Sequence, residues 1–205
     1  MIKAILFDLD GVLVDACEWH YITLNKALQE VVGFEISRED HESTYNGLST
    51  KVKLKMLGIE DSKISQKIWQ RKQDLTWETI DRLAKKDNKK RTTHWILKEK
   101  GYKLAVVTNA IKKSAKLMLE KTKQIKYMEF IIGNEDVENN KPHPDCYLLA
   151  MKNLEVEPNE TLIVEDSEKG KKAAYASGAF VLEVKNSTEV TAVNILNRIE
   201  EIEGR

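Results

Sequence analysis

The chain has 205 residues, of which 41% are hydrophobic and 32% are charged, and its 33 Lys and Arg residues are balanced by 33 Asp and Glu residues. This composition excludes a disordered chain and a membrane protein, and a formal net charge of zero argues against a nucleic-acid-binding protein. The length suits one large domain, or a core with a smaller insertion. We therefore expect a globular protein that binds neither nucleic acid nor membrane, and a monomer is the default.

The two cysteines, Cys17 and Cys146, have neither the number nor the spacing of a disulfide framework or a metal site, which favours a cytoplasmic location. The first apolar run covers only residues 4–7, which is too short for a signal peptide. No segment reaches the ~18 apolar residues of a membrane helix.

Five short apolar runs predict strands. Runs without alternation are typical of parallel strands that are buried on both faces, and helical patterns lie between the later ones. This rhythm predicts an α/β fold with a doubly wound parallel sheet. The five runs cover residues 4–7, 104–107, 130–132, 162–164 and 180–184.

Residues 16–88 break this rhythm, because they show helical periodicity and no convincing strand. We predict an all-helical cap domain over 16–88, inserted into a core formed by 1–15 and 89–205. Such an insertion would cover the carboxyl edge of the sheet, where ligands bind in this class of fold. The insertion ends in a charge run over residues 85–91, which we interpret as a solvated helix end and linker rather than a patch that attracts an anionic substrate. Four tryptophans are interpreted as core residues rather than as the lining of a substrate pocket: Trp19, Trp69, Trp77 and Trp95.

Two carboxylates follow the first predicted strand. Asp8 and Asp10 are two residues apart at the strand end, so they point to the same side and crowd one small volume. Like charges this close are unfavourable unless a cation or a shared proton relieves them. Gly11 lets the backbone turn sharply at this point.

Polar residues of other kinds follow the later strands. The Thr108 hydroxyl and the backbone amides from Asn109 onward precede a helix, an arrangement that can hold a phosphate. Lys141 lies on a loop stiffened by two prolines, and Glu165 and Asp166 follow another strand. Few protein ligands, all of them hard oxygens, suit Mg²⁺. The sequence therefore predicts a magnesium and phosphate site at the sheet edge.

The chain resembles the haloacid dehalogenase superfamily, in the branch of β-phosphoglucomutase-like and phosphoglycolate phosphatase-like enzymes with a helical cap on a Rossmann-like core. The resemblance covers nearly the whole chain. It implies that Asp8 is the nucleophile that forms an aspartyl-phosphate and that Asp10 is the general acid and base. It further implies that Thr108 and Lys141 hold the phosphoryl group. The motifs that carry the resemblance are Asp8-Leu9-Asp10-Gly11-Val12, Thr108-Asn109, Lys141-Pro142 and Glu165-Asp166-Ser167.

The resemblance also implies a ligand set for Mg²⁺. Asp8, the Asp10 carbonyl and Asp166 would bind the ion, and Glu165 would either bind it or support a ligand. Phosphoryl transfer by Asp8 requires the charges of carboxylate and phosphate to be screened, which Mg²⁺ and Lys141 would supply. The dehalogenases of the superfamily lack the second Asp, so Asp10 indicates phosphoryl transfer.

Four cap residues are candidates for substrate contact. His20 and Lys72 match cap positions of β-phosphoglucomutase, and the alternative is that each is an ordinary surface residue. Thr50 stands where the mutase carries Arg, and a hydroxyl cannot replace a bidentate phosphate clamp. The neighbouring Lys51 would compensate only in part.

We therefore expect a Mg²⁺-dependent phosphatase of a small phosphorylated metabolite, such as a sugar phosphate. The alternatives are a β-phosphoglucomutase-like mutase and a non-catalytic member of the fold. A signalling receiver domain also holds an aspartyl-phosphate, but it predicts an acceptor on the middle strand and ~120 residues without an insertion, so we set it aside.

Overall fold

The computed structural model describes residues 1–204 and divides into two compact units. One unit comprises residues 1–15 and the chain from Lys85 onward, and the other comprises residues 16–84. The second boundary lies four residues before the predicted one, because the helix that begins the return to the core starts at Asn88 and residues 85–87 lead into it. Asp87 caps that helix by accepting a hydrogen bond from the Lys90 amide.

The core unit is built on a five-stranded, all-parallel sheet with the order β3-β2-β1-β4-β5. This order places the first strand in the centre and confirms the predicted α/β class. The short predicted runs were recognisable because β1 and β4 are buried at every position. The strands are β1 (Ala4–Phe7), β2 (Lys103–Val107), β3 (Ile131–Ile132), β4 (Thr161–Glu165) and β5 (Phe180–Glu183).

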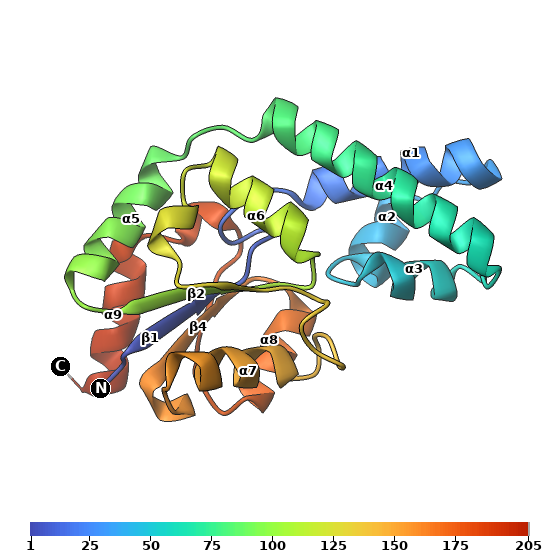
Figure 1. Cartoon of the computed structure of the whole chain (residues 1–205). Helices are drawn as coiled ribbons and strands as arrows, with labels where there is room; N and C mark the ends of the chain where they lie inside the picture. Colours follow the sequence, from blue (N-terminus) through green and yellow to red (C-terminus); the bar gives the residue numbers. More distant parts are fainter. Residues whose placement is uncertain (205) are drawn as a thin grey trace. The chain divides into compact units, whose positions relative to one another are not determined.

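Helices cover both faces of this sheet (Figure 1). One face carries α7 (Asp145–Leu154) and α8 (Glu168–Ala176), and the other carries α5 (Asn88–Glu99), α6 (Lys112–Lys121) and α9 (Ala192–Glu203). Alternate residues of each strand face the two layers, which explains why the central positions of the strands are apolar on both faces. Against α7 and α8 the core is formed by residues such as Leu6, Val107, Ile163, Tyr147 and Ala150.

The second unit is entirely helical within residues 16–84. It contains α1 (Cys17–Val32), α2 (Arg38–Asp40), the π-helix η1 (His41–Tyr45), α3 (Thr50–Met56) and α4 (Ser62–Leu83). α1 ends at Gly33, whose φ of 67° is the left-handed conformation that glycine adopts readily. The unit has a hydrophobic core of its own, formed by Leu24, Ala27, Leu28, Ile36, Leu54, Ile68 and Leu75.

Asn25 fixes the loop that follows α1. Its amide nitrogen donates to the Ile36 carbonyl at 2.8 Å, and its amide oxygen accepts from the Ile36 backbone amide at 2.9 Å. All of these groups are buried, so each bond also removes the penalty of an unpaired polar group. We call such a pair of hydrogen bonds, from one asparagine side chain to both backbone groups of another residue, a clasp. This clasp holds Ile36 in the core of the helical unit.

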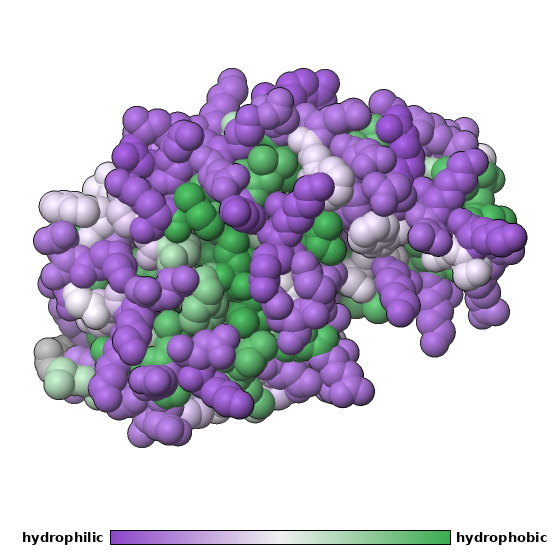
Figure 2. All heavy atoms as spheres, viewed as in Figure 1, coloured by the Kyte–Doolittle hydropathy of each residue, from purple (hydrophilic) through white to green (hydrophobic). Residues whose placement is uncertain are grey.

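Charged and polar side chains cover most of the face that Figure 2 shows. The interpretation of the tryptophans as core residues is wrong for Trp95, which is 54% exposed because the inward face of α5 is taken by His94 and Leu97. The other three tryptophans are half-buried. The charge run is likewise not entirely solvated, since Lys90 is buried and donates to the Ser187 and Val190 carbonyls. No helix within residues 1–204 is both long and apolar enough to cross a membrane.

Candidate active site

The candidate site lies where β1, β2 and β4 end side by side. Phe7 of β1 pairs with Val106 of β2 and with Val164 of β4, so the three strands end at nearly the same level. The residues that follow are therefore brought to one edge of the sheet, and β1 contributes Asp8 at its centre. This is the position at which open α/β sheets bind ligands.

The Lys141 ammonium joins the ends of three strands, β1, β2 and β4. Its Nζ donates to Asp8 Oδ1 at 2.7 Å, to Glu165 Oε1 at 2.5 Å and to the Val107 carbonyl at 2.9 Å, and it lies 4.7 Å from the centre of the Tyr147 ring. Burial alone would lower the pKa of Lys141, but the carboxylates of Asp8 and Glu165 outweigh it and raise that pKa. The lysine is therefore a permanent cation in the centre of the site.

Glu165 fixes the Lys141 ammonium from the buried side of the site. Its side chain is fully buried, and Oε1 accepts from Lys141 and, at 2.6 Å, from the Tyr147 hydroxyl. Oε2 accepts from the Asp166 and Ser167 amides and from the Ser167 hydroxyl. A Cβ at Gly170 would lie 1.9 Å from Oε1, so only glycine fits beneath the carboxylate. Because protein donors occupy both oxygens, Glu165 is built as an anchor, and metal ligation by its side chain stays a prediction.

The Asn109 side chain fixes Lys141 rather than lying open to a ligand. Its amide nitrogen donates to the Lys141 carbonyl and its amide oxygen accepts from the Lys141 backbone amide, both at 3.1 Å. The Asn134 side chain in turn donates to the Asn109 carbonyl. The side-chain amide of Asn109 therefore positions Lys141, and the predicted phosphate contact, which rests on the backbone amides from Asn109 onward, stays a prediction. This role could not be inferred from the motif, because the two residues are 32 positions apart.

Asp166 and Asp8 form the open side of the cluster. One oxygen each from Asp8, Glu165 and Asp166 lie within 4.8 Å of one another. Burial, followed by the charge of Glu165, raises the pKa of Asp166 to about 6, and burial also raises the pKa of Asp8 well above its ordinary value, against the effect of Lys141. Asp166 Oδ1 is buried without a hydrogen-bond partner. A hard cation is what such a surplus of buried carboxylate oxygens fits.

Asp10 and Thr108 border the cluster. Asp10 lies outside the group of three acids but close enough for its charge to raise the pKa of both Asp8 and Asp166. The Thr108 hydroxyl is buried and accepts from the Ala110 amide at 3.0 Å, which leaves its proton for another acceptor. The turn between Asp8 and Val14 passes close to Asp166, since a Cβ at Gly11 would lie 2.1 Å from Asp166 Oδ2.

The helical unit holds the remaining predicted residues. His20 Nδ1 and Lys72 Nζ are 3.3 Å apart, and Lys72 is buried, so its interpretation as a solvated helix residue is wrong. Thr50 begins α3 and is half-buried, whereas Lys51 is exposed. Substrate contact by these four residues stays a prediction.

Sequence reasoning missed two further buried groups in the helical unit. His41 is 3% exposed and Lys53 is 6% exposed. Burial, then the charges of Lys53 and His20, lower the pKa of His41 to about 4. The sequence pattern gave no indication that either residue is buried. Lys53 lies beside Leu54 in α3, and periodicity assigns buried positions of a helix to apolar residues.

Comparison with known proteins places this geometry among enzymes. The sequence profile described as "Haloacid dehalogenase-like hydrolase" matches residues 5–184. The chain is 30% identical, over 184 residues, to a putative pyrophosphatase PpaX from Caldanaerobacter subterraneus subsp. tengcongensis, with 90% of this chain and 82% of that protein aligned. It is 28% identical, over 183 residues, to a phosphorylated carbohydrates phosphatase from Thermotoga maritima, with 86% and 82% aligned.

Solved structures agree on the fold. The crystal structure of β-phosphoglucomutase from Clostridium difficile superimposes with a TM-score of 0.86 at 24% sequence identity, and the match covers 100% of both chains. At this identity the likeness concerns the fold, and the chemistry has to be argued from the residues themselves.

Proposed function

Since the chain belongs to the haloacid dehalogenase-like hydrolase family, we propose that it is a Mg²⁺-dependent phosphatase of a small phosphorylated metabolite. Asp8 is the nucleophile, and the reaction passes through an aspartyl-phosphate. The observation that carries the proposal is the Lys141 ammonium, which binds Asp8 and the fully buried Glu165 beside an Asp166 oxygen that has no partner.

Asp8 is held for attack on phosphorus. Lys141 binds its Oδ1 at 2.7 Å, and no hydrogen bond within residues 1–204 engages Oδ2. The second oxygen therefore forms the bond to phosphorus while the bond from phosphorus to the substrate oxygen breaks. The charge of Lys141 reduces the repulsion between the Asp8 carboxylate and the incoming phosphate.

The acidic cluster fits Mg²⁺ because it lacks positive charge. Lys141 is paired with Asp8 and Glu165, no ion pair within residues 1–204 reaches Asp166, and the pKa of both Asp8 and Asp166 is raised. Asp8, Asp166 and the Asp10 carbonyl would hold the ion. When bound, Mg²⁺ screens the phosphate charge and polarises the phosphoryl group.

Thr108 and Lys141 bind the phosphoryl oxygens. The Thr108 hydroxyl accepts from Ala110 and so has its proton to donate. Lys141 serves the nucleophile and the phosphoryl group together, and the Asn109 clasp fixes the backbone from which it extends. Fixed donors of this kind act without reorganisation when charge develops in the transition state.

Asp10 transfers the protons. It protonates the substrate oxygen as that oxygen leaves phosphorus, and in the second half-reaction it takes a proton from the water that attacks the aspartyl-phosphate. Hydrolysis releases inorganic phosphate and regenerates the Asp8 carboxylate. One residue therefore serves as acid and then as base, and its proton balance closes over the cycle.

Water is the proposed acceptor rather than a second hydroxyl of a sugar. A mutase must grip a bisphosphate at both ends, and Thr50 stands where the resembling mutase carries Arg. The relatives named above are a phosphatase of phosphorylated carbohydrates and a putative pyrophosphatase. A small phosphomonoester such as a sugar phosphate is thus the proposed substrate class. Cys17 and Cys146 form no disulfide within residues 1–204, in keeping with a reducing, cytoplasmic setting. A monomer remains the proposed state.

The test is phosphate release from sugar phosphates, phosphoglycolate, nucleotides and pyrophosphate, with Mg²⁺ and with EDTA. We expect Mg²⁺-dependent release that falls by roughly 10³-fold or more in Asp8→Asn. Asp15→Asn, at an exposed position on the same segment, is the matched control and should retain the wild-type rate. Absence of release from every compound contradicts the phosphatase, and an isomerised sugar phosphate without free phosphate favours a mutase. Full activity in Asp8→Asn would overturn the mechanism.

A further inference from the structure

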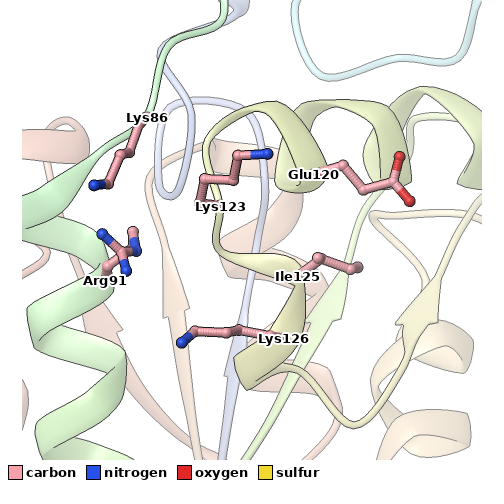
Figure 3. Close-up of a pocket in the computed structure, with 6 residues that line it drawn as sticks. All are labelled: Lys86, Arg91, Glu120, Lys123, Ile125 and Lys126. Carbon is pink, nitrogen blue, oxygen red and sulfur yellow. The ribbon is translucent and has the colours of Figure 1, made fainter.

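The core unit contains a cavity that the proposed reaction does not use. It has a volume of about 720 Å³, which lies in the range of small-molecule sites. Its lining comes from the segment that precedes α5, from α5 itself, from the end of α6 and from the 3-10 helix η2 (Ile125–Tyr127). The lining residues are shown in Figure 3: Lys86, Arg91, Glu120, Lys123, Ile125 and Lys126.

The charge of this lining is one-sided. Four basic side chains face a single carboxylate, Glu120, which is paired with Lys116 on the outside of α6 and points away from Arg91 and Lys126 in Figure 3. None of the four has an ion-pair partner within residues 1–204. Some other basic residues of this electrically neutral protein do form ion pairs, as in Arg38–Glu18, Arg71–Glu30, Lys98–Glu129 and Lys112–Asp136.

Arg91 carries a donor that the protein leaves unused. Its Nη1 donates to Asn88 Oδ1 at 2.9 Å, but its Nε is buried without a hydrogen-bond partner. Leaving a buried donor of a charged group unpaired is unfavourable. The guanidinium stands beside Lys86 in the cavity wall, with the Lys126 side chain extending toward it from η2 (Figure 3). Because Nε itself is shielded from solvent, an anion in the cavity would reach the guanidinium through its Nη groups.

Lys123 adds a second unfavourable feature at the same place. It directly follows the cap residue of α6 and has a φ of 62°, a left-handed conformation in which glycine or asparagine is usual. A lysine costs stability at this position compared with glycine. What it contributes instead is a positive charge at the cavity. The strained Lys123 and the guanidinium of Arg91 therefore lie at the same basic cavity, and both carry the positive charge that attracts an anion.

The geometry points to a second binding site, in which this cavity binds a small molecule that carries two or more phosphoryl groups. The planar guanidinium of Arg91 can bind a phosphate through two hydrogen bonds, and the lysine ammonium groups in the lining add positive charge beside it. A concave cavity of this volume suits a compact polyanion rather than an extended nucleic acid. The charge run over residues 85–91, interpreted from the sequence as a solvated linker, supplies two of the cationic side chains.

The test is titration of ¹⁵N-labelled protein with methylenediphosphonate, a bisphosphonate that phosphatases do not hydrolyse, in EDTA at low salt. Without metal the test does not depend on the proposed reaction. We expect amide shifts at residues 86–91 and 123–126 that saturate with a Kd below about 1 mM. Absence of shifts, or shifts confined to residues 8–11 and 108–110, would overturn the proposal.

Three variants make the test specific. Arg91→Gln should weaken binding roughly tenfold, and Lys89→Gln, which removes an exposed charge of the same run outside the cavity lining, should leave the Kd unchanged. Lys123→Gly should weaken binding and also raise the melting temperature, since it removes the strain. An equal effect of Lys89→Gln would mean that surface charge alone attracts the probe. That result, or an unchanged Kd in both Arg91→Gln and Lys123→Gly, contradicts the site.

Discussion

Both compact units fix a loop with an asparagine that bonds to the two backbone groups of one distant residue, but what they fix differs. In the helical unit Asn25 holds Ile36, an apolar residue 11 positions away in the hydrophobic core. In the core unit Asn109 holds Lys141, a buried cation 32 positions away. The same clasp therefore secures packing in one unit and charge in the other. Removal of the Asn25 clasp should therefore change mainly the free energy of unfolding, and removal of the Asn109 clasp should change mainly kcat.

The largest effect is expected from replacing Lys141, the residue that the Asn109 clasp holds. Lys141→Met leaves Glu165 buried without its cation, and we expect a loss of about 3–5 kcal/mol in the free energy of unfolding. Urea denaturation measures it, with Lys89→Met as the control at an exposed site. A loss below about 1 kcal/mol would contradict the role of Lys141 as the partner that the buried carboxylate requires.

Each unit also buries a histidine, and both histidines should make the protein less stable in acid. Burial lowers the pKa of His94 to about 4 from 6.5, despite its bond to Gln124, so His94 stays neutral in the folded protein at pH values at which the unfolded chain is protonated. Stability is complete above pH 6.5 and declines as the pH falls toward 4, by up to about 3 kcal/mol for this group.

His94→Gln should flatten this decline, as measured by denaturation at pH 7, 6, 5 and 4. His143→Gln, at an exposed position, should leave it unchanged. His41 in the helical unit has a pKa lowered in the same direction, so His41→Gln should flatten part of the same decline. If neither variant alters the slope, the acid sensitivity arises from the carboxylates.

The two clasps can be compared directly by removing each amide. Asn25→Ala should lower the free energy of unfolding by about 2 kcal/mol, because two buried backbone groups lose their partner, while kcat per folded molecule stays near the wild-type value. Asn109→Ala should lower kcat by about 10²-fold through displacement of Lys141. Equal effects of the two variants on kcat would remove the distinction between packing and charge.

The smallest effect is expected at an exposed ion pair of the helical unit. Glu30 accepts from Arg71 at 2.5 Å, but both side chains are more than one-third exposed. Water and salt screen such a pair. Glu30→Gln should therefore leave the melting temperature within experimental error at low and at high salt. A clear decrease would show that this pair, like Lys141 and Glu165, is part of the framework.

The sheet and the residues at its edge could be predicted from the sequence, because both are written in short contiguous stretches. β1 is apolar throughout and β4 is apolar from Leu162 to Val164, and the polar residues that matter come directly after these apolar runs. Parallel strands bring their carboxyl ends together in any doubly wound sheet. The meeting of Asp8 with Glu165 and Asp166 follows from that topology.

The supporting contacts could not be predicted, because they join residues that share no local pattern. Tyr147 was recognisable only as one apolar position of a helix, whereas its hydroxyl binds Glu165. Asn109 reaches Lys141 across 32 residues, and Lys123 reveals its strain only through its backbone angle. The exposure of Trp95 and of Lys72 was also misjudged. Periodicity indicates which residues share one face of a helix, but not which other elements pack against that face.

The glycine beneath Glu165 ties two positions of the chain to one another. A methyl group at position 170 would overlap the Glu165 carboxylate, so replacing either residue alone removes the anchor of Lys141 or leaves a gap. We therefore expect a side chain at position 170 to displace the Glu165 carboxylate and to weaken its hold on Lys141. The glutamate that ends β4 and the glycine five residues later thus form one buried anchor for the lysine.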